Sequence, residues 1–173
     1  MVTIIEIWLT PSRTTISAEA RAAYDKSVAT LKELSAKSPS NTTVRYNLGL
    51  SYLKRSSFLS DSGDATNAIE NANEAAKIGD ALLRIDANNA AARTLLALSD
   101  EELGKCNALL ATKATTSSNE RTDDWRKARD WYQKGLDLFL DMKGKDTLNG
   151  ANARKPDELA KEIAKCDAAL AQR

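Results

Sequence analysis

Few residues in this 173-residue chain are of the types that carry out enzymatic chemistry. Histidine is absent, which excludes Ser-His-Asp and Cys-His catalysis, a His-containing zinc or haem site, and an imidazole pH switch. The two cysteines, Cys106 and Cys166, lie far apart and form no Cys-x-x-Cys pair, so they predict neither a disulfide framework nor a metal site. We expect both to be small apolar core residues in a protein of a reducing compartment, the cytoplasm.

Adjacent carboxylates occur at Asp123-Asp124 and at Glu101-Glu102, and closely placed acids can share a proton in acid/base catalysis. Neighbouring side chains point about 100° apart around a helix, so neither pair is expected to form such a dyad. The first pair is expected to cap a helix and the second to lie on a solvated face. The phosphate-binding pattern Gly-x-x-x-x-Gly-Lys-[Ser/Thr] is also missing. The sequence therefore predicts a protein that is not an enzyme and has no cofactor or metal.

Four of the nine aromatic residues lie within a stretch of 15 residues, at Trp125, Trp131, Tyr132 and Phe139. Such a cluster could form a stacking platform for a ligand. Its spacing is helical, however, and it belongs to a wide apolar stripe, which favours a helix packed in the core between a preceding helix and a C-terminal cap.

Composition predicts the elements that must position these residues. Seven glycines and three prolines in 173 residues favour long helices with few sharp turns, and the length suits one domain with a core of its own. Lys and Arg number 25 against 24 Asp and Glu, so no basic footprint for nucleic acid is present. Residues 1–9 are apolar but contain Glu6, lack a basic region and are followed by Pro11, which predicts neither a signal peptide nor a membrane span.

Apolar spacing from Ser17 onward predicts an all-α protein of about six helices in three pairs, at about 17–60, 64–113 and 122–172. Residues 1–15 are expected to be a tail, a docking strand or a scar of truncation, and 16–173 to be the helical domain. Helix N-caps are predicted at Ser17, at Ser40 or Asn41, at Asp64, at Asn88 or Asn89, and at Thr122 or Asp123, with Pro156 at the first position of the last helix. The stretch 115–119 is expected to be a loop.

Apolar spacing also predicts which faces of two helices are buried. The first helix is expected to bury one face, made of Ala20, Tyr24, Val28, Leu31 and Leu34. The third is expected to bury a face of small residues, made of Ala68, Ala72, Ala75, Gly79 and Leu82.

The chain repeats itself internally. Residues 38–51 align without gaps on residues 86–99, an offset of 48, with five of 14 positions identical. The same offset carries Ala20 onto Ala68 and Leu34 onto Leu82. Helices that repeat in tandem at one period are typical of an α-solenoid.

Two short patterns resemble the tetratricopeptide repeat (TPR). Leu48-Gly49-x-x-Tyr52 resembles the signature of its first helix, and Ala20-x-x-x-Tyr24 and Ala128-x-x-x-Tyr132 resemble that of its second. The chain departs from the family in that Arg45 and Arg93 stand at the usual Trp position, Ala97 and Asp100 replace Gly and Tyr, the terminal proline is missing, and the period exceeds the usual 34 residues. The resemblance implies an α-solenoid of long antiparallel helix pairs with a C-terminal capping helix.

A further resemblance lies in the C-terminal third, in 125–133 (Trp-Arg-Lys-Ala-Arg-Asp-Trp-Tyr-Gln), 155–158 and 162–167. These segments are similar to the end of the TPR-like region that follows the catalytic domain in many bacterial eukaryotic-like serine/threonine kinases. The resemblance spans roughly residues 38–172 and implies a regulatory or substrate-docking module. It implies no kinase activity, because the Gly-rich loop, HRD and DFG motifs are absent.

In such a solenoid the first helix of each pair lines a concave face. Carried over position by position, this face would expose Thr43, Tyr46, Leu50, Leu53 and Lys54 from one repeat, and Ala91, Thr94, Leu98, Glu101 and Glu102 from the next. The mixture suits a protein partner that docks as a peptide or a helix, and not nucleic acid or a membrane. Alternatively, these leucines pack on a neighbouring helix. A second alternative is an oligomerisation domain that forms a homodimer, because about two and a half repeats are few for an isolated solenoid.

Overall fold

The computed structural model describes residues 13–172, with side chains from residue 18 onward. Within that range all regular structure is helical, which confirms the all-α prediction. Six α-helices and one short 3₁₀-helix follow one another: α1 (Arg13–Lys37), α2 (Thr42–Asp61), α3 (Ala65–Ile85), α4 (Ala90–Ala111), α5 (Ser118–Gly144), η1 (Gly150–Asn152) and α6 (Lys155–Ala171). The tail or docking strand predicted for residues 1–15 falls outside the described range except for its last three residues, which belong to α1.

Side-chain caps begin three of the helices at predicted residues. Asn41, Asp64 and Asn89 each accept a hydrogen bond from the backbone N–H three residues later, at the starts of α2, α3 and α4. These bonds satisfy backbone donors that a helix start leaves without intrahelical partners.

The two turns at the 48-residue offset have the same hydrogen-bond pattern. In the first, Ser38 N–H donates to the carbonyl of Leu34 and Asn41 N–H to that of Ser38. In the second, Asp86 N–H donates to the carbonyl of Leu82 and Asn89 N–H to that of Asp86. The repeat read from the sequence therefore corresponds to a repeated local structure.

Two predicted helix starts are wrong. The first helix begins at Arg13, so Ser17 lies inside it and is not its cap. The fifth begins at Ser118 rather than at Thr122 or Asp123, because Ser117 and Glu120 form a capping box in which each side chain accepts from the other's backbone N–H. Most of the predicted loop at 115–119 is consequently the cap and first turn of α5.

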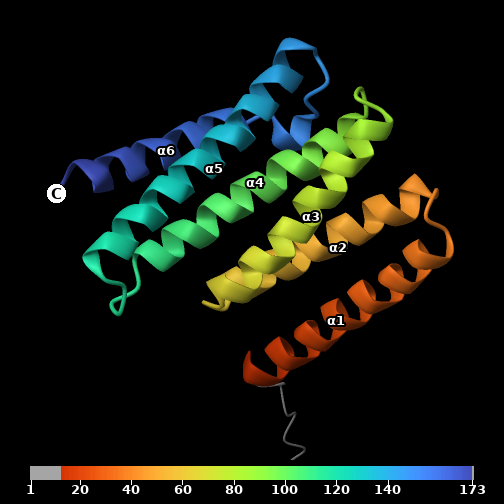
Figure 1. Cartoon of the computed structure of the whole chain (residues 1–173), viewed down its shortest axis with the longest axis horizontal. Helices are drawn as coiled ribbons and strands as arrows, with labels where there is room; N and C mark the ends of the chain where they lie inside the picture. The colour runs from red at the N-terminus through yellow and green to blue at the C-terminus, as the bar shows by residue number, and fades with distance from the viewer. Residues whose placement is uncertain (1–12, 173) are drawn as a thin grey trace, which may run out of the picture.

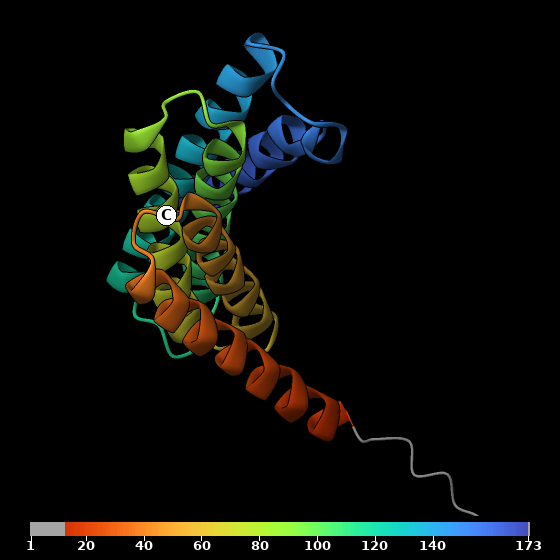
Figure 2. The same cartoon turned by 90° about the vertical axis from the view of Figure 1, so that its right-hand side faces the viewer.

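Each helix contacts the next one along the chain, and α2 also contacts α4 (Figure 1). In a view turned by 90°, α2 and α6 lie toward one side of the molecule and α3 and α5 toward the other (Figure 2). None of the helices in the described part of the chain is both long and apolar enough to cross a membrane.

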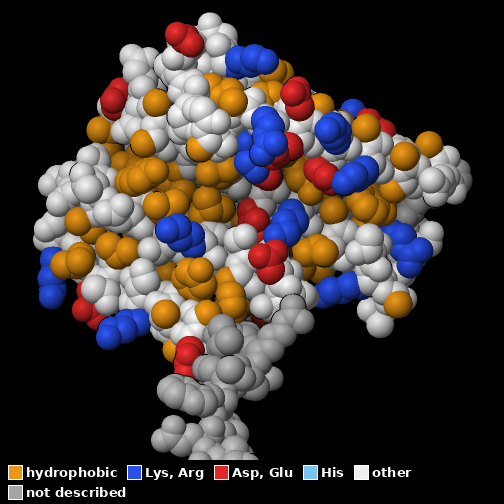
Figure 3. Space-filling view, turned by 180° about the vertical axis from the view of Figure 1, so that it is seen from behind, with side chains coloured by type: hydrophobic (Ala, Val, Ile, Leu, Met, Phe, Trp, Pro, Cys, Tyr) orange, Lys and Arg blue, Asp and Glu red, His pale blue; other side chains and the backbone are white. Residues whose placement is uncertain are grey.

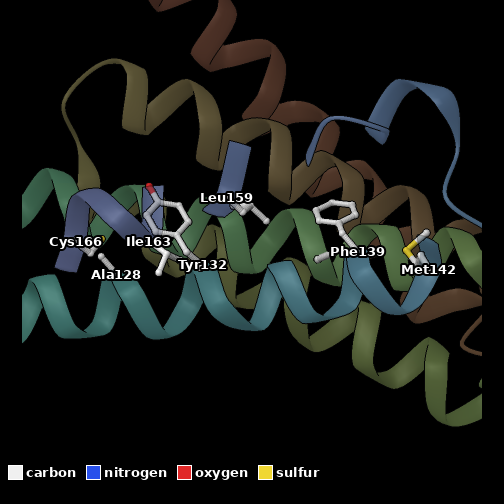
Figure 4. Packing of buried hydrophobic residues seen from close by; sticks show 8 residues of the cluster. Ala128, Tyr132, Phe139, Met142, Leu159, Ile163 and Cys166 are labelled. Carbon is white, nitrogen blue, oxygen red and sulfur yellow. The ribbon is translucent and has the colours of Figure 1, made fainter. Parts of the chain in front are cut away.

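Three clusters of buried side chains hold the helices together. The largest joins α4, α5 and α6 and contains Ala97, Ala128, Tyr132, Phe139, Met142, Leu159, Ile163 and Cys166 (Figure 4). Tyr132 and Phe139 are buried there and Trp125 packs against the cluster, so α5 is packed between α4 and α6 as predicted. Trp131 is half-buried, with the Lys134 ammonium 3.8 Å from its ring centre.

The small-residue face of α3 is buried as predicted, from Ala68 to Leu82. Glycines also let α4 approach its neighbours closely. A Cβ added at Gly49 of α2 would lie only 2.6 Å from the Leu95 side chain of α4, and one added at Gly104 of α4 would lie 2.6 Å from the Tyr132 ring of α5. Leu34, expected on the buried face of the first helix, is instead 44% exposed.

Candidate functional site

The candidate site is the surface that α2 and α4 form together. We call it the α2–α4 face and define it by the predicted residues that are at least partly exposed: Thr43, Tyr46, Leu50, Leu53, Lys54, Ala91, Thr94, Leu98 and Glu101. Their spacing of three or four residues places each set on one side of its helix, and the two helices are in contact. Seen from the side where α2 and α6 lie, the molecule shows hydrophobic side chains gathered around a central group of charged ones (Figure 3).

Three apolar residues of the face serve both the surface and the core. Tyr46 and Leu53 pack against a buried cluster that includes Val28 and Leu95, and Leu98 packs against the α4–α6 cluster. All three nevertheless stay partly exposed. The alternative in which these residues pack on neighbouring helices is therefore correct for all three, while their role in lining a groove stays a prediction.

Shallow pockets lie at the two ends of the face. One, of about 190 Å³, is lined by residues of α2 and α4, Thr43, Tyr46 and Ala91 among them. The other, of about 380 Å³, lies between α4, α5 and α6 and is lined by Glu101, Lys105, Tyr132, Glu158, Leu159 and Glu162. The first pocket shows that predicted residues of α2 and α4 come together in space.

An ion-pair network borders the second pocket. Lys155 donates to Glu101 at 2.8 Å and lies 3.4 Å from Glu158, which ties α6 to α4. Burial opposes the charged ammonium of Lys155, but the hydrogen bond to Glu101 and the two nearby carboxylates raise its pKa. Burial likewise raises the pKa of the Tyr132 hydroxyl, so this group stays protonated at neutral pH. At this end of the face, Lys155 therefore pairs with the carboxylates of Glu101 and Glu158.

The predicted exposure of Glu102 is wrong. Its side chain is buried and accepts a hydrogen bond from the Ser60 hydroxyl of α2, with Lys105 3.8 Å away. Burial raises the pKa of this carboxyl, while the bond to Ser60 and the charge of Lys105 lower it. Glu102 thus joins α4 to α2 from within and does not line the groove.

The carboxylate pairs do not form catalytic dyads. Glu101 pairs with α6 and Glu102 with α2, so the two point toward different helices. Glu101 is partly exposed, whereas Glu102 is buried and so does not lie on the solvated face expected for the pair. Asp123 and Asp124 lie inside α5 rather than capping it, and each forms an ion pair with the basic residue three positions on. Their placement is explained by helix-surface pairing.

Both cysteines are buried, as predicted. Cys106 packs with Leu59, Ala65 and Ala68, while Cys166 lies in the α4–α6 cluster. Burial raises the pKa of the Cys106 thiol to about 12 and that of Cys166 to about 11. Within the described residues no group of three or more His, Cys, Asp or Glu side chains could hold a metal ion.

Several residues that line or border the second pocket were not among the predicted site residues. Lys105 stands four positions after Glu101, a spacing that places both on one side of a helix and could have identified it. Lys155, Glu158 and Glu162 come from α6, and no sequence pattern indicated that their side chains would lie near Glu101 of α4. Comparison of the chain with protein-family models, curated protein sequences and solved structures finds no match.

Proposed function

We propose that this chain is a TPR-like α-solenoid of antiparallel helix pairs that acts as a non-catalytic protein-interaction module. The observation that carries the proposal is the α2–α4 face, where Tyr46, Leu50, Leu53 and Leu98 remain partly exposed on two contacting helices. Contiguous apolar surface rimmed by polar groups is typical of interaction sites.

The repeat interpretation has two structural supports. The turns before α2 and α4 have the same hydrogen-bond pattern, 48 residues apart in the sequence. In addition, α2 contacts α4 although α3 separates them in sequence. Stacked helical hairpins produce such contacts between equivalent helices of adjacent repeats.

The chemistry of the face favours a peptide or an amphipathic helix as the occupant. It offers the leucine side chains and the Tyr46 ring together with the charges of Lys54 and Glu101. An amphipathic helix would place apolar anchors on the leucines at intervals of three or four residues.

The proposed setting is regulation or substrate docking beside a bacterial serine/threonine kinase. The residues that carry this resemblance lie on α5 and α6, and Tyr132, Glu158 and Glu162 among them line the second pocket of the face. A docking role requires no catalytic group in this chain.

The test is a peptide selected from a random displayed library on the intact protein, with its affinity measured on matched variants. Leu50→Glu and Leu98→Glu place a charge on the face, and we expect each to weaken binding at least about tenfold, which corresponds to 1.4 kcal/mol. Leu140→Glu is the control, because Leu140 is 47% exposed on α5, outside the face. Equal affinity in all three variants would refute the assignment.

Light scattering separates this function from self-association. If the α2–α4 face binds other proteins, we expect the wild-type chain to be a monomer. If the protein is a dimer that Leu50→Glu converts to an unfolded monomer, the oligomerisation alternative replaces the proposal.

A further inference from the structure

Acidic side chains from two helices line the second pocket of the α2–α4 face. This pocket, of about 380 Å³, is bordered by Glu101 from α4 and by Glu158 and Glu162 from α6. Glu158 and Glu162 stand four residues apart and therefore lie on the same side of α6. The apolar side chain of Leu159 also lines the pocket. Three carboxylates thus converge on one small volume that has an apolar wall.

The ammonium groups at the pocket do not balance these carboxylates. Lys105 also lines the pocket, but it lies 2.6 Å from Asp61 and 3.8 Å from Glu102, two acids outside the lining. The three lining carboxylates are left with two cations, Lys155 and the exposed Lys165. The pocket therefore has a net negative charge, which favours a positively charged ligand.

Two buried oxygen atoms at the pocket have no hydrogen-bond partner. Tyr132 lines the pocket and is 4% exposed, and its hydroxyl forms no hydrogen bond with another residue in the described part of the chain. This hydroxyl lies at the end of the ring that points away from α5 (Figure 4). Lys155 binds Oε1 of Glu101, whereas the buried Oε2 is unpaired. Buried polar atoms without partners are rare because they lose their hydration without replacement. Both atoms accept hydrogen bonds, so a ligand with N–H donors suits them.

A guanidinium group matches these acceptors better than an ammonium group. It has five N–H donors in a rigid plane and binds a carboxylate through two parallel bonds, whereas an ammonium group is a point charge with three donors. One guanidinium can therefore donate to Glu162 of α6 and to Tyr132 of α5 together. The apolar stem of an arginine side chain can pack on Leu159.

The pocket lies next to the apolar part of the face. Leu98 stands three residues before Glu101, so the two side chains are neighbours on one side of α4. A peptide with an apolar anchor on Leu98 can therefore place a second side chain in the pocket.

We infer that the second pocket binds an arginine side chain of a protein partner docked on the α2–α4 face, with its guanidinium donating to Glu162 and to the Tyr132 hydroxyl beside Glu101. This inference rests on the proposed function and adds the chemistry of the partner. The docking peptide carries an arginine within about two helical turns of its anchor on Leu98.

The test uses two forms of the peptide selected on the intact protein. We expect arginine to be enriched at one position among the selected sequences. Replacing that arginine by citrulline, which is neutral and similar in shape, should lower the affinity for wild type at least about tenfold. In Glu162→Gln the same replacement should cost less than about threefold, because the carboxylate that pairs with the guanidinium is already missing.

Glu74→Gln is the matched control. Glu162 and Lys165 form a surface ion pair three residues apart at 2.6 Å, and Glu74 and Lys77 form the same pair at the same distance on α3, outside the pocket. Loss of either pair has little effect on stability, so the citrulline peptide should bind Glu74→Gln and wild type equally weakly. Tyr132→Phe keeps the ring and removes only the hydroxyl, and it should weaken the arginine peptide more than the citrulline peptide.

Three results would overturn the inference: selected peptides in which arginine is not enriched, a cost of citrulline that is equal in Glu162→Gln and Glu74→Gln, or an equal effect of Tyr132→Phe on both peptides. These results are distinct from failure of the proposed function. With the face correct and the pocket wrong, Leu50→Glu and Leu98→Glu still weaken the peptide while Leu140→Glu does not.

Discussion

Close approach of α4 and α5 at Gly104 leads to a quantitative prediction for Gly104→Ala. A Cβ at this position would lie 2.6, 2.7 and 2.8 Å from three atoms of the Tyr132 ring. That residue is 4% exposed and packs in the α4–α6 cluster, so moving its ring would disturb its packing there. Either the ring or the helix must therefore shift.

Two opposing effects set the size of the change. Alanine favours a helix interior over glycine by about 1 kcal/mol, while overpacking a filled core costs about 1–3 kcal/mol. Because the overlap involves a rigid, enclosed ring, we expect the upper part of that range and a net loss of about 1–2 kcal/mol in the free energy of unfolding. Gly144→Ala is the matched control, since no atom lies within 4 Å of the added Cβ, and it should cause no loss.

Urea unfolding followed by far-UV circular dichroism measures both variants from their midpoints at constant m-value. Tyr132→Leu removes the ring, so Gly104→Ala should cost less in that background than in wild type. The packing argument is refuted if Gly104→Ala is as stable as Gly144→Ala, or if its cost is the same with and without the Tyr132 ring.

Three further predictions concern caps, a buried acid and the thiols. Asn41→Ala and Asn89→Ala should each lower the free energy of unfolding by about 1 kcal/mol in urea titrations, and costs that differ by more than about 0.5 kcal/mol would contradict equivalent repeat turns. Burial raises the pKa of Asp100 to about 7, so the folded chain keeps a proton that the unfolded chain releases near pH 4 and stability falls as the pH rises between these values. Asp100→Asn should therefore increase stability, by up to about 4 kcal/mol, at pH 8 and not at pH 4; an equal effect at both would contradict this. Cys106 and Cys166 should react with a thiol reagent at pH 8 only as fast as the chain unfolds, and rapid labelling of the native protein would show that they are accessible.

Features determined by neighbours in the sequence could be predicted well. Asn41, Asp64 and Asn89 cap their helices through a bond to a backbone group three residues away, so the local pattern contains the information. The small-residue face of α3 was predictable for the same reason, since its spacing alone sets which side can approach another helix closely.

Features determined by contacts between distant helices could not be predicted. The sequence predicts Glu102 at the surface because nothing in its own helix indicates that the Ser60 hydroxyl of α2 donates a hydrogen bond to it. Leu34 belongs to an apolar stripe but lies near the end of α1, which packs on α2 and leaves that side chain 44% exposed. The start of α5 was missed for a different reason, because polar residues at 115–119 suit a loop and a capping box equally well.

Mapping of the bound peptide by amide chemical-shift changes tests the central claim most directly. On addition of the selected peptide to the isotope-labelled protein, we predict that the largest changes fall on residues of the α2–α4 face, with Leu50, Leu53 and Leu98 among them. The outward positions of α3 and α5 should change little, and the exposed Ile85 and Leu140 report on them. Changes centred on Ile85 and Leu140, with the α2–α4 face unaffected, would contradict the account.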